Sequence, residues 1–184
     1  MDDLISEVGR INEIIQGMLS FAKPREPNKE MVNLKTLLNQ SVQMVSNIAN
    51  KAGASVSLNY PVPDEELMAD PAQLKQVFLN VLMNAIQSIE GKEGLVTIDV
   101  DAVSQSPNFE GNSGGYVIEV ADNGKGIARE NLERIFDPFF TTKDDGTGLG
   151  LSVTYGIVHR HGGEIEISSE LNIGTKVRIK LPAE

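Results

Sequence analysis

The residues most suited to chemistry are glycines at alternate positions in the stretch KDDGTGLGLS, residues 143–152. Gly146, Gly148 and Gly150 follow an acidic pair and precede an apolar segment. Glycines in such a loop can turn backbone N–H groups toward phosphate oxygens, and a helix that begins inside the motif would add the positive end of its dipole. The pattern predicts a polyphosphate site held by backbone amides and by Lys143.

Two common phosphate motifs do not account for this loop. The pattern GxxxxGK followed by Ser or Thr occurs nowhere in the chain. The dinucleotide fingerprint needs a strand directly before its glycines, where the segment TTKDD stands. A flexible linker is the remaining alternative, but the apolar helix that is predicted to begin inside the motif argues against it.

A second candidate is a row of amide side chains on one predicted helix. Asp70 as N-cap and Pro71 at the first helical position predict a helix over 71–89, in which Lys75 is the one charged residue. Amide oxygens can bind a hard cation such as magnesium, and amide N–H groups can bind phosphate without adding charge. A polar face beneath a loop is the alternative. The stripe consists of Gln73, Gln76, Asn80, Asn84 and Gln87.

The stretch VADNGKGIA places a carboxylate at the end of a predicted strand. Asn123 and Gly124 alone are a common turn signal, and a simple loop is the usual meaning of such a pair. Asp122 and Gly126 add a possible function. A carboxylate beside a glycine that lets a flat ring approach the backbone can accept the exocyclic amine of adenine and would reject the carbonyl of guanine.

Three of the six phenylalanines fall within five residues, in the segment IFDPFFTTK that precedes the glycines. Phe136, Phe139 and Phe140 predict a loop that is anchored at its base. His159 and His161 also suggest a metal site, but side chains two positions apart near a helix end cannot share one helical face. We expect both histidines to be surface or capping residues.

Composition excludes several classes of function. With 26 acidic and 16 basic residues and a net charge of −10, the chain repels phosphate backbones and anionic membranes, so neither nucleic acid nor a lipid surface is an expected partner. The chain has no cysteine for disulfides or thiolate metal sites. Residues 1–20 are too charged for a signal peptide, and we expect a cytoplasmic protein.

The hydrophobic periodicity predicts an α/β fold in which helices cover one face of a mixed sheet. A first helix begins at an Asn33 cap and ends near Gly53, and a later one spans 149–161. The stretch 123–148 is expected to be irregular, and the last two strands form a hairpin. The expected strands cover 56–60, 95–103, 116–122, 164–169 and 175–181.

The N-terminal residues 1–24 differ from the rest of the chain. Their apolar positions are spaced alternately by four and three residues, which is typical of a coiled-coil helix, although a helix packed on its own domain would show similar spacing. The segment KPREPNKE that follows contains two prolines and reads as a linker. The expected organisation is therefore a helix over 1–24, a linker over 25–31 and a domain over 32–184.

Together these motifs resemble the N, G1, F and G2 boxes of sensor histidine kinases, in the same order and at similar spacing. The matching stretches are LNVLMNA, DNGKGI, FDPFFTTK and GTGLGLS. Residues 32–184 resemble the catalytic ATP-binding domain, and 1–24 resemble the second helix of the dimerisation and phosphotransfer domain. The short loop between FDPFFTTK and the glycines is similar to the nitrogen-regulation branch of these kinases.

The resemblance implies a Bergerat-type (GHKL) two-layer sandwich that binds ATP and Mg²⁺ and delivers the γ-phosphoryl group to a histidine, for onward transfer to a response regulator. It implies a homodimer formed through the dimerisation helices. It also implies Asn84 as magnesium ligand and Asn80, Asn84 and Lys143 as catalytic residues. The implied nucleotide contacts are Asp122, Gly124, Gly126, Ile127, Phe140, Thr141, Thr142, Lys143, Gly146, Thr147, Gly148, Leu149, Gly150, Leu151 and Thr175.

Two features bear on related functions. The family's acceptor histidine lies on a helix before the one that 1–24 resemble, and neither His159 nor His161 lies in its motif, so this chain is expected to bind ATP without a phosphorylation site of its own. ATPases that resemble gyrase or Hsp90 carry a glutamate where this chain has Asn80, and an amide cannot serve as general base. A protein-serine kinase of the same fold, or a nucleotide-binding module without turnover, remains an alternative.

Overall fold

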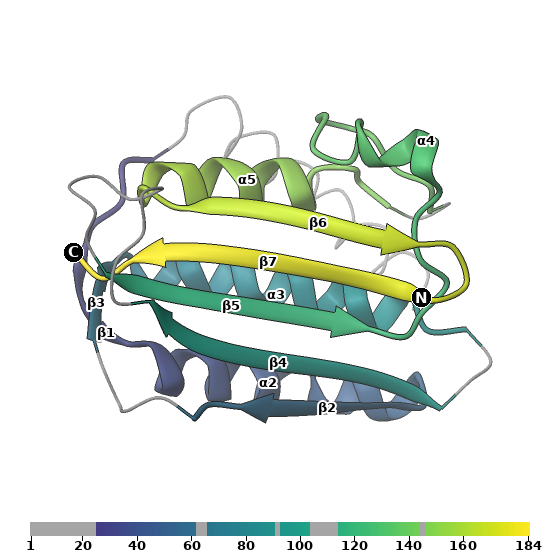
Figure 1. Ribbon diagram of the computed structural model, residues 1–184, viewed down its shortest axis with the longest axis horizontal. Coiled ribbons are helices and arrows are strands. Elements are labelled where there is room, and N and C mark those ends of the chain that lie inside the picture. Colours follow the sequence, from purple (N-terminus) through teal and green to yellow (C-terminus); the bar gives the residue numbers. More distant parts are fainter. Residues whose placement is uncertain (1–24, 62–65, 91–92, 104–113, 144–145) are drawn as a thin grey trace, which may run out of the picture.

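The central element is a five-stranded mixed sheet covered on one face by three helices, in a computed structural model that describes residues 25–61, 66–90, 93–103, 114–143 and 146–184 (Figure 1). The strand order is β2-β4-β5-β7-β6, with β2 parallel to β4 and the other neighbours antiparallel. The predicted α/β sandwich is therefore confirmed. The strands are β2 (Ala54–Asn59), β4 (Gly94–Val103), β5 (Gly115–Asp122), β6 (Glu164–Glu170) and β7 (Gly174–Pro182).

The helices begin where the sequence predicts them. The Asn33 side chain accepts from Thr36 N at 2.8 Å, and Asp70 Oδ1 accepts from Ala72 N and Gln73 N, each at 3.0 Å. These caps satisfy N–H groups that have no partner within the helix. The three helices of the covering layer are α2 (Leu34–Lys51), α3 (Pro71–Gln87) and α5 (Gly150–Arg160).

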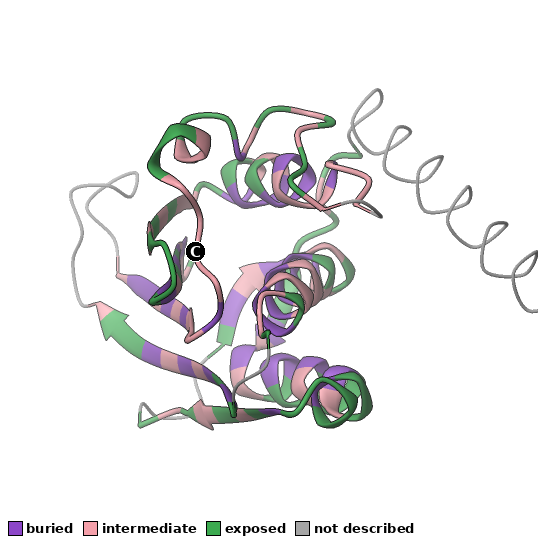
Figure 2. Cartoon of the chain, turned by 90° about the vertical axis from the view of Figure 1, so that its right-hand side faces the viewer, coloured by how far each residue is buried: buried purple, intermediate pink, exposed green. Residues whose placement is uncertain are grey.

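Alternate side chains of the strands face the helix layer and form the core. Tyr116, Ile118 and Val120 of β5 are buried in the core. Figure 2 shows the buried residues of the sheet and of the helices between the two layers. Because side chains alternate along a strand, Asp122 continues this row at the end of β5. Thr175 pairs with Asp122 in the β5–β7 register, so the two residues lie side by side.

Three elements were not predicted. β1 (Glu30–Asn33) pairs antiparallel with β3 (Glu66–Ala69), and β1 begins inside the expected linker. Val32 and Leu67 of this pair are buried, so the small sheet extends the core. The helix α4 (Arg129–Leu132) lies within the stretch that was expected to be irregular. The predicted helix over 1–24 lies outside the described residues.

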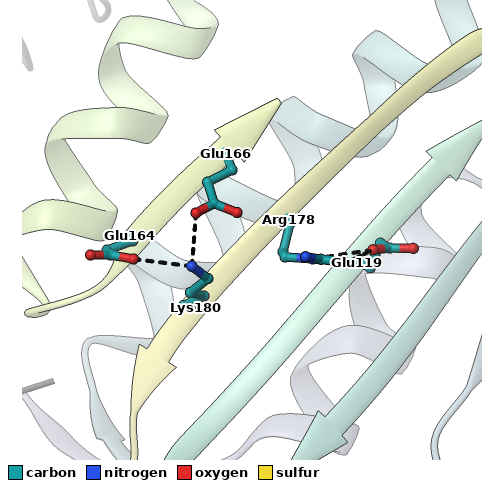
Figure 3. Close-up of polar contacts among 5 residues, drawn as sticks. All are labelled: Glu119, Glu164, Glu166, Arg178 and Lys180. Carbon is teal, nitrogen blue, oxygen red and sulfur yellow. Dashed lines mark hydrogen bonds and ion pairs between the residues drawn. The ribbon is translucent and has the colours of Figure 1, made fainter. Parts of the chain in front are cut away.

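The opposite face of the sheet carries charged side chains that pair across strands (Figure 3). Lys180 Nζ lies 3.2 Å from Glu164 Oε2 and 2.8 Å from Glu166 Oε1, and Arg178 Nη2 lies 2.8 Å from Glu119 Oε2. Among the helices that the structure describes, none is long and apolar enough to span a membrane.

Candidate nucleotide-binding site

The carboxylate of Asp122 is held through one of its oxygens. Oδ1 accepts hydrogen bonds from Ser88 Oγ at 2.9 Å, from Gly124 N at 2.9 Å and from Thr175 N at 3.3 Å. Within the described part of the chain, no hydrogen bond reaches Oδ2. Since an ionised carboxylate is an acceptor at both oxygens, Oδ2 retains the capacity to accept a donor from a ligand.

Thr175 is fixed by a serine that sequence reasoning missed. Ser169 Oγ lies 2.9 Å from Thr175 Oγ1 and 2.9 Å from Gly174 O, and it accepts from Ile127 N at 2.8 Å. The loop after β5 is thereby tied to the β6–β7 hairpin. A shallow hollow of about 350 Å³ lies at these strand ends, lined by Ala121, Asp122, Ser168, Ser169, Glu170, Ile173, Gly174, Thr175 and Lys176.

The glycines after Asp122 allow close packing between protein segments. A Cβ on Gly124 would overlap Ser88 Oγ, and a Cβ on Gly126 would overlap the carbonyl oxygen of Glu170. Gly126 also has a φ of +69°, which L side chains rarely adopt. The loop therefore lies directly against the end of α3 and against the β6–β7 turn, beside the Asp122 carboxylate.

The amide stripe of α3 receives a cation from the glycine-rich loop. Lys143 Nζ donates to Asn84 Oδ1 at 2.9 Å and to Gln87 Oε1 at 2.7 Å. Burial lowers the pKa of Lys143, the charge of Lys125 lowers it further, and Asp122 partly offsets both. The ammonium group shows that these two amide oxygens can hold a positive ion, and oxygen ligands of this type fit Mg²⁺.

Asn80 joins α3 to the start of α5. Its Nδ2 donates to Gly150 O at 3.1 Å and to Thr154 Oγ1 at 3.3 Å. Asn80 and Asn84 thus both contact the segment that leads into α5. A Cβ on Gly150 would meet its nearest atom, Asn80 Cγ, only at 3.9 Å, so the first turn of α5 is less crowded than the loop after β5.

Phe139 and Gly148 lie side by side, at the two ends of the segment before α5. Phe139 N donates to Gly148 O at 2.9 Å, and Lys143 N donates to Thr141 Oγ1 at 3.1 Å. The Arg134 guanidinium lies 4.5 Å from the centre of the Phe140 ring. Of the other expected contact residues, Thr142 is exposed, Leu151 is half-buried and Leu149 is buried, with Leu149 N 3.4 Å from Thr147 Oγ1.

The two histidines occupy different environments. His159 is exposed, as expected. His161 is the C-cap of α5, in line with the expected capping role, and only 2% of it is exposed. Its Nε2 accepts from Asp70 N at 3.0 Å, and its Nδ1 lies 2.8 Å from Ile157 O, which requires the proton on Nδ1. Burial lowers the pKa of His161. This residue joins the end of α5 to the start of α3.

Comparison with known proteins identifies the class to which this fold and site belong. Residues 69–184 match the family described as Histidine kinase-, DNA gyrase B-, and HSP90-like ATPase, and the chain belongs to this family. Within it, the chain carries the catalytic ATP-binding domain of a sensor histidine kinase. The resemblance of the sequence to the catalytic ATP-binding domain of sensor histidine kinases is therefore confirmed.

Two curated relatives match almost the whole chain. The chain is 39% identical over 181 residues to sensor histidine kinase ZraS of Escherichia coli, covering 97% of this chain and 36% of the relative. It is 36% identical over 182 residues to sporulation kinase A of Bacillus subtilis, covering 98% of this chain and 28% of the relative. The chain therefore spans about a third of the length of these proteins.

Solved structures support the same class. The nucleotide-free catalytic domain of histidine kinase ThkA matches with a TM-score of 0.71 and 29% identity, covering 85% of this chain and 96% of that one. Histidine kinase ThkA in complex with response regulator protein TrrA matches with a TM-score of 0.79 and 25% identity, covering all of this chain and 50% of that one.

Proposed function

We propose that this chain binds ATP with Mg²⁺ and transfers the γ-phosphoryl group to a histidine on a dimerisation helix, as part of a sensor histidine kinase. The observation that supports the proposal best is the Asp122 carboxylate, whose Oδ1 receives three donors while Oδ2 can accept the adenine amine. Thr175 lies beside it on β7.

The amide oxygens of α3 are the proposed ligands for the metal. Asn84 Oδ1 and Gln87 Oε1 hold the Lys143 ammonium, and the same oxygens would hold Mg²⁺ once Lys143 moves onto a phosphate. Bound magnesium would supply neutralisation of phosphate charge. Lys143 and the backbone amides of Gly146, Gly148 and Gly150 would bind the phosphate oxygens.

Phosphoryl transfer to a histidine requires alignment of the reacting groups and neutralisation of phosphate charge, and it does not require a base from the protein. The bond between the γ-phosphorus and the ADP oxygen breaks as a bond to an imidazole nitrogen forms, and the imidazole proton passes to solvent. Asn80 stands where hydrolytic relatives carry a glutamate, and its amide donates to Gly150 O and Thr154 Oγ1. An amide cannot activate water, which favours phosphotransfer over hydrolysis.

The wider assembly belongs to the same proposal. Residues 1–24 would be the second dimerisation helix, and the intact kinase would be a cytoplasmic homodimer or carry its catalytic part in the cytoplasm. The ThkA match, solved with response regulator protein TrrA, supports a receiver domain as the next phosphate acceptor. The short loop after FDPFFTTK supports the nitrogen-regulation branch. The net charge of −10 disfavours nucleic acid as a partner.

Titration of ATP with Mg²⁺ into the chain tests the nucleotide site. Asp122→Asn is expected to weaken ATP binding about ten- to a hundredfold. The amide oxygen would stay on the three donors that Oδ1 accepts from, so the amide N–H group would face the adenine amine, which is another donor, and an unpaired polar group costs ~1–3 kcal/mol. Glu119→Gln, on the same strand but on the open face, is the matched control and should bind ATP normally. Equal affinity for both variants would contradict the site.

Labelled ATP tests the transfer. With an added fragment that carries the acceptor helix of a histidine kinase, the chain should produce phosphate that is labile in acid and stable in alkali. Asn84→Ala should abolish this transfer, whereas Gln76→Ala, an exposed member of the same stripe, should retain it. Acid-stable phosphoserine would favour the serine-kinase alternative.

A further inference from the structure

Ser88 joins the end of α3 to the Asp122 carboxylate. Its Oγ lies 2.7 Å from Ala85 O and 2.9 Å from Asp122 Oδ1. A serine hydroxyl carries one proton, so the two acceptors compete for it. A hydrogen bond to an ionised acceptor is roughly twice as strong as one between neutral groups. The proton therefore points to Asp122 whenever the carboxylate is charged.

Ser88 is the one side chain among the described residues that donates to this carboxylate. The other two donors to Oδ1 are the backbone N–H groups of Gly124 and Thr175. These backbone donors come from the loop after β5 and from β7. The Ser88 hydroxyl comes from the helix layer, and together the three donors fix the rotation of the carboxylate.

Neighbouring residues contact both the backbone and the side chain of Ser88. Lys125 N donates to Ser88 O at 2.9 Å, and a Cβ on Gly124 would overlap Ser88 Oγ. Ser88 N lies 3.1 Å from Asn84 O, one helical turn earlier. The last turn of α3 and its C-cap thus carry the proposed metal ligand, Asn84, and the hydroxyl that contacts Asp122.

We propose that Ser88 is a positioning residue for adenine recognition. By donating to Oδ1, it holds the Asp122 carboxylate in the rotation that presents Oδ2 to the exocyclic amine of the base. This inference depends on the proposed function, since it assigns the Asp122 carboxylate to adenine. It adds a residue of the helix layer to the groups that select the base.

Two nucleotides separate the effect of Ser88 on the base from any effect on the fold. The probes are ATP and purine riboside triphosphate, which lacks the exocyclic amine, each titrated with Mg²⁺ into the 184-residue chain. The unchanged chain should prefer ATP by about tenfold or more. Ser88→Ala should weaken ATP binding about three- to tenfold and leave purine riboside triphosphate binding unchanged.

Ser88→Thr and Ser88→Val form a matched pair that differs mainly by the hydroxyl. The threonine variant should keep the preference for ATP, and the valine variant should lose it. If the added methyl group weakens the binding of both nucleotides, the ratio of the two affinities still measures the effect of the hydroxyl.

The outcomes distinguish this inference from the proposed function. Equal binding of the two nucleotides by the unchanged chain would contradict the contact between Asp122 and adenine. A normal preference that persists in Ser88→Ala and Ser88→Val would overturn the role of Ser88 alone. If Ser88→Ala and Ser88→Val bind both nucleotides more weakly by the same factor, so that the ratio of the two affinities is unchanged, Ser88 only supports the fold.

Discussion

The two faces of the central sheet hold their charged groups in different ways. On the helix-covered face, Asp122 is held by a hydroxyl and two backbone N–H groups, without a paired charge in hydrogen-bonding contact. On the open face, Glu119 is paired with Lys176 and Arg178, each at 2.8 Å. Burial raises the pKa of Glu119, but the bonds to Lys176 and Arg178 outweigh burial and lower it.

The different partners of Asp122 and Glu119 distinguish a binding site from a solvated surface. An exposed ion pair can be replaced by water and contributes little, whereas a group held by fixed neutral donors keeps its orientation and its remaining acceptor. Substitutions on the helix-covered side should therefore cost more than substitutions on the open face, and three measurements would break or sharpen this contrast.

The largest expected effect is at Gly124. Gly124→Ala should lower the free energy of unfolding by about 1–3 kcal/mol and abolish ATP binding, because the new Cβ would overlap Ser88 Oγ and would lie 2.6 Å from Ser88 Cβ and Ser88 O. Denaturation by urea and titration with ATP measure the two effects. Gly150→Ala is the control, since its Cβ would meet nothing closer than Asn80 Cγ at 3.9 Å, and its stability should change by less than about 1 kcal/mol. Similar losses of stability for the two variants would contradict the packing described for Gly124.

The sequence predicts the parts of this site that depend on local pattern. Asp70 followed by Pro71 marks the start of α3, and the alternation in β5 places Asp122 in line with the core. The amide stripe predicts a polar site on one face of α3, and Asn84 and Gln87 of this stripe accept from Lys143.

The contacts that depend on distant residues could not be predicted. Ser88 reaches Asp122 across 34 positions, and a single serine at the end of a helix gives no local signal of that contact. β1 and β3 span four residues each, which is too short for a period of two to stand out. The burial of His161 could not be predicted, because its partner, Asp70, lies 91 positions away.

An intermediate effect is expected at His161, within the helix layer. Its lowered pKa means that the unfolded chain binds a proton more readily than the folded one, so stability is fully present above the usual histidine value of about 6.5 and is lost as the pH falls below it. Protonation of Nε2 also removes the acceptor for Asp70 N, a loss of about 0.5–1.5 kcal/mol. Urea unfolding at about pH 7.5 and 5.5 measures the difference.

Several charged groups around His161 also affect its pKa. Lys29 and Arg160 lower the pKa of His161 and Asp70 raises it, but burial has the largest effect. Burial raises the pKa of Asp70, but three backbone hydrogen bonds outweigh burial and take it below 3.8, so Asp70 stays charged over this pH range. His161→Gln should remove the loss of stability between the two pH values, and the exposed His159→Gln should leave it unchanged. A loss that persists in His161→Gln would contradict the assignment.

The smallest expected effect is on the open face, at Lys180. The hydrogen bond to Glu166 raises the pKa of Lys180 against the opposing effect of burial, with a further contribution from Glu164. Lys180→Gln should nevertheless lower the free energy of unfolding by only about 0.2–1 kcal/mol, because both carboxylates are solvated, with exposed fractions of 42% and 55%. The loss should shrink as salt is raised from about 0.01 M to 1 M, since the screening length falls to about 3 Å. ATP affinity should be unchanged, because Lys180 lies on the side of the sheet away from Asp122; a loss of affinity there would show that the two faces are coupled.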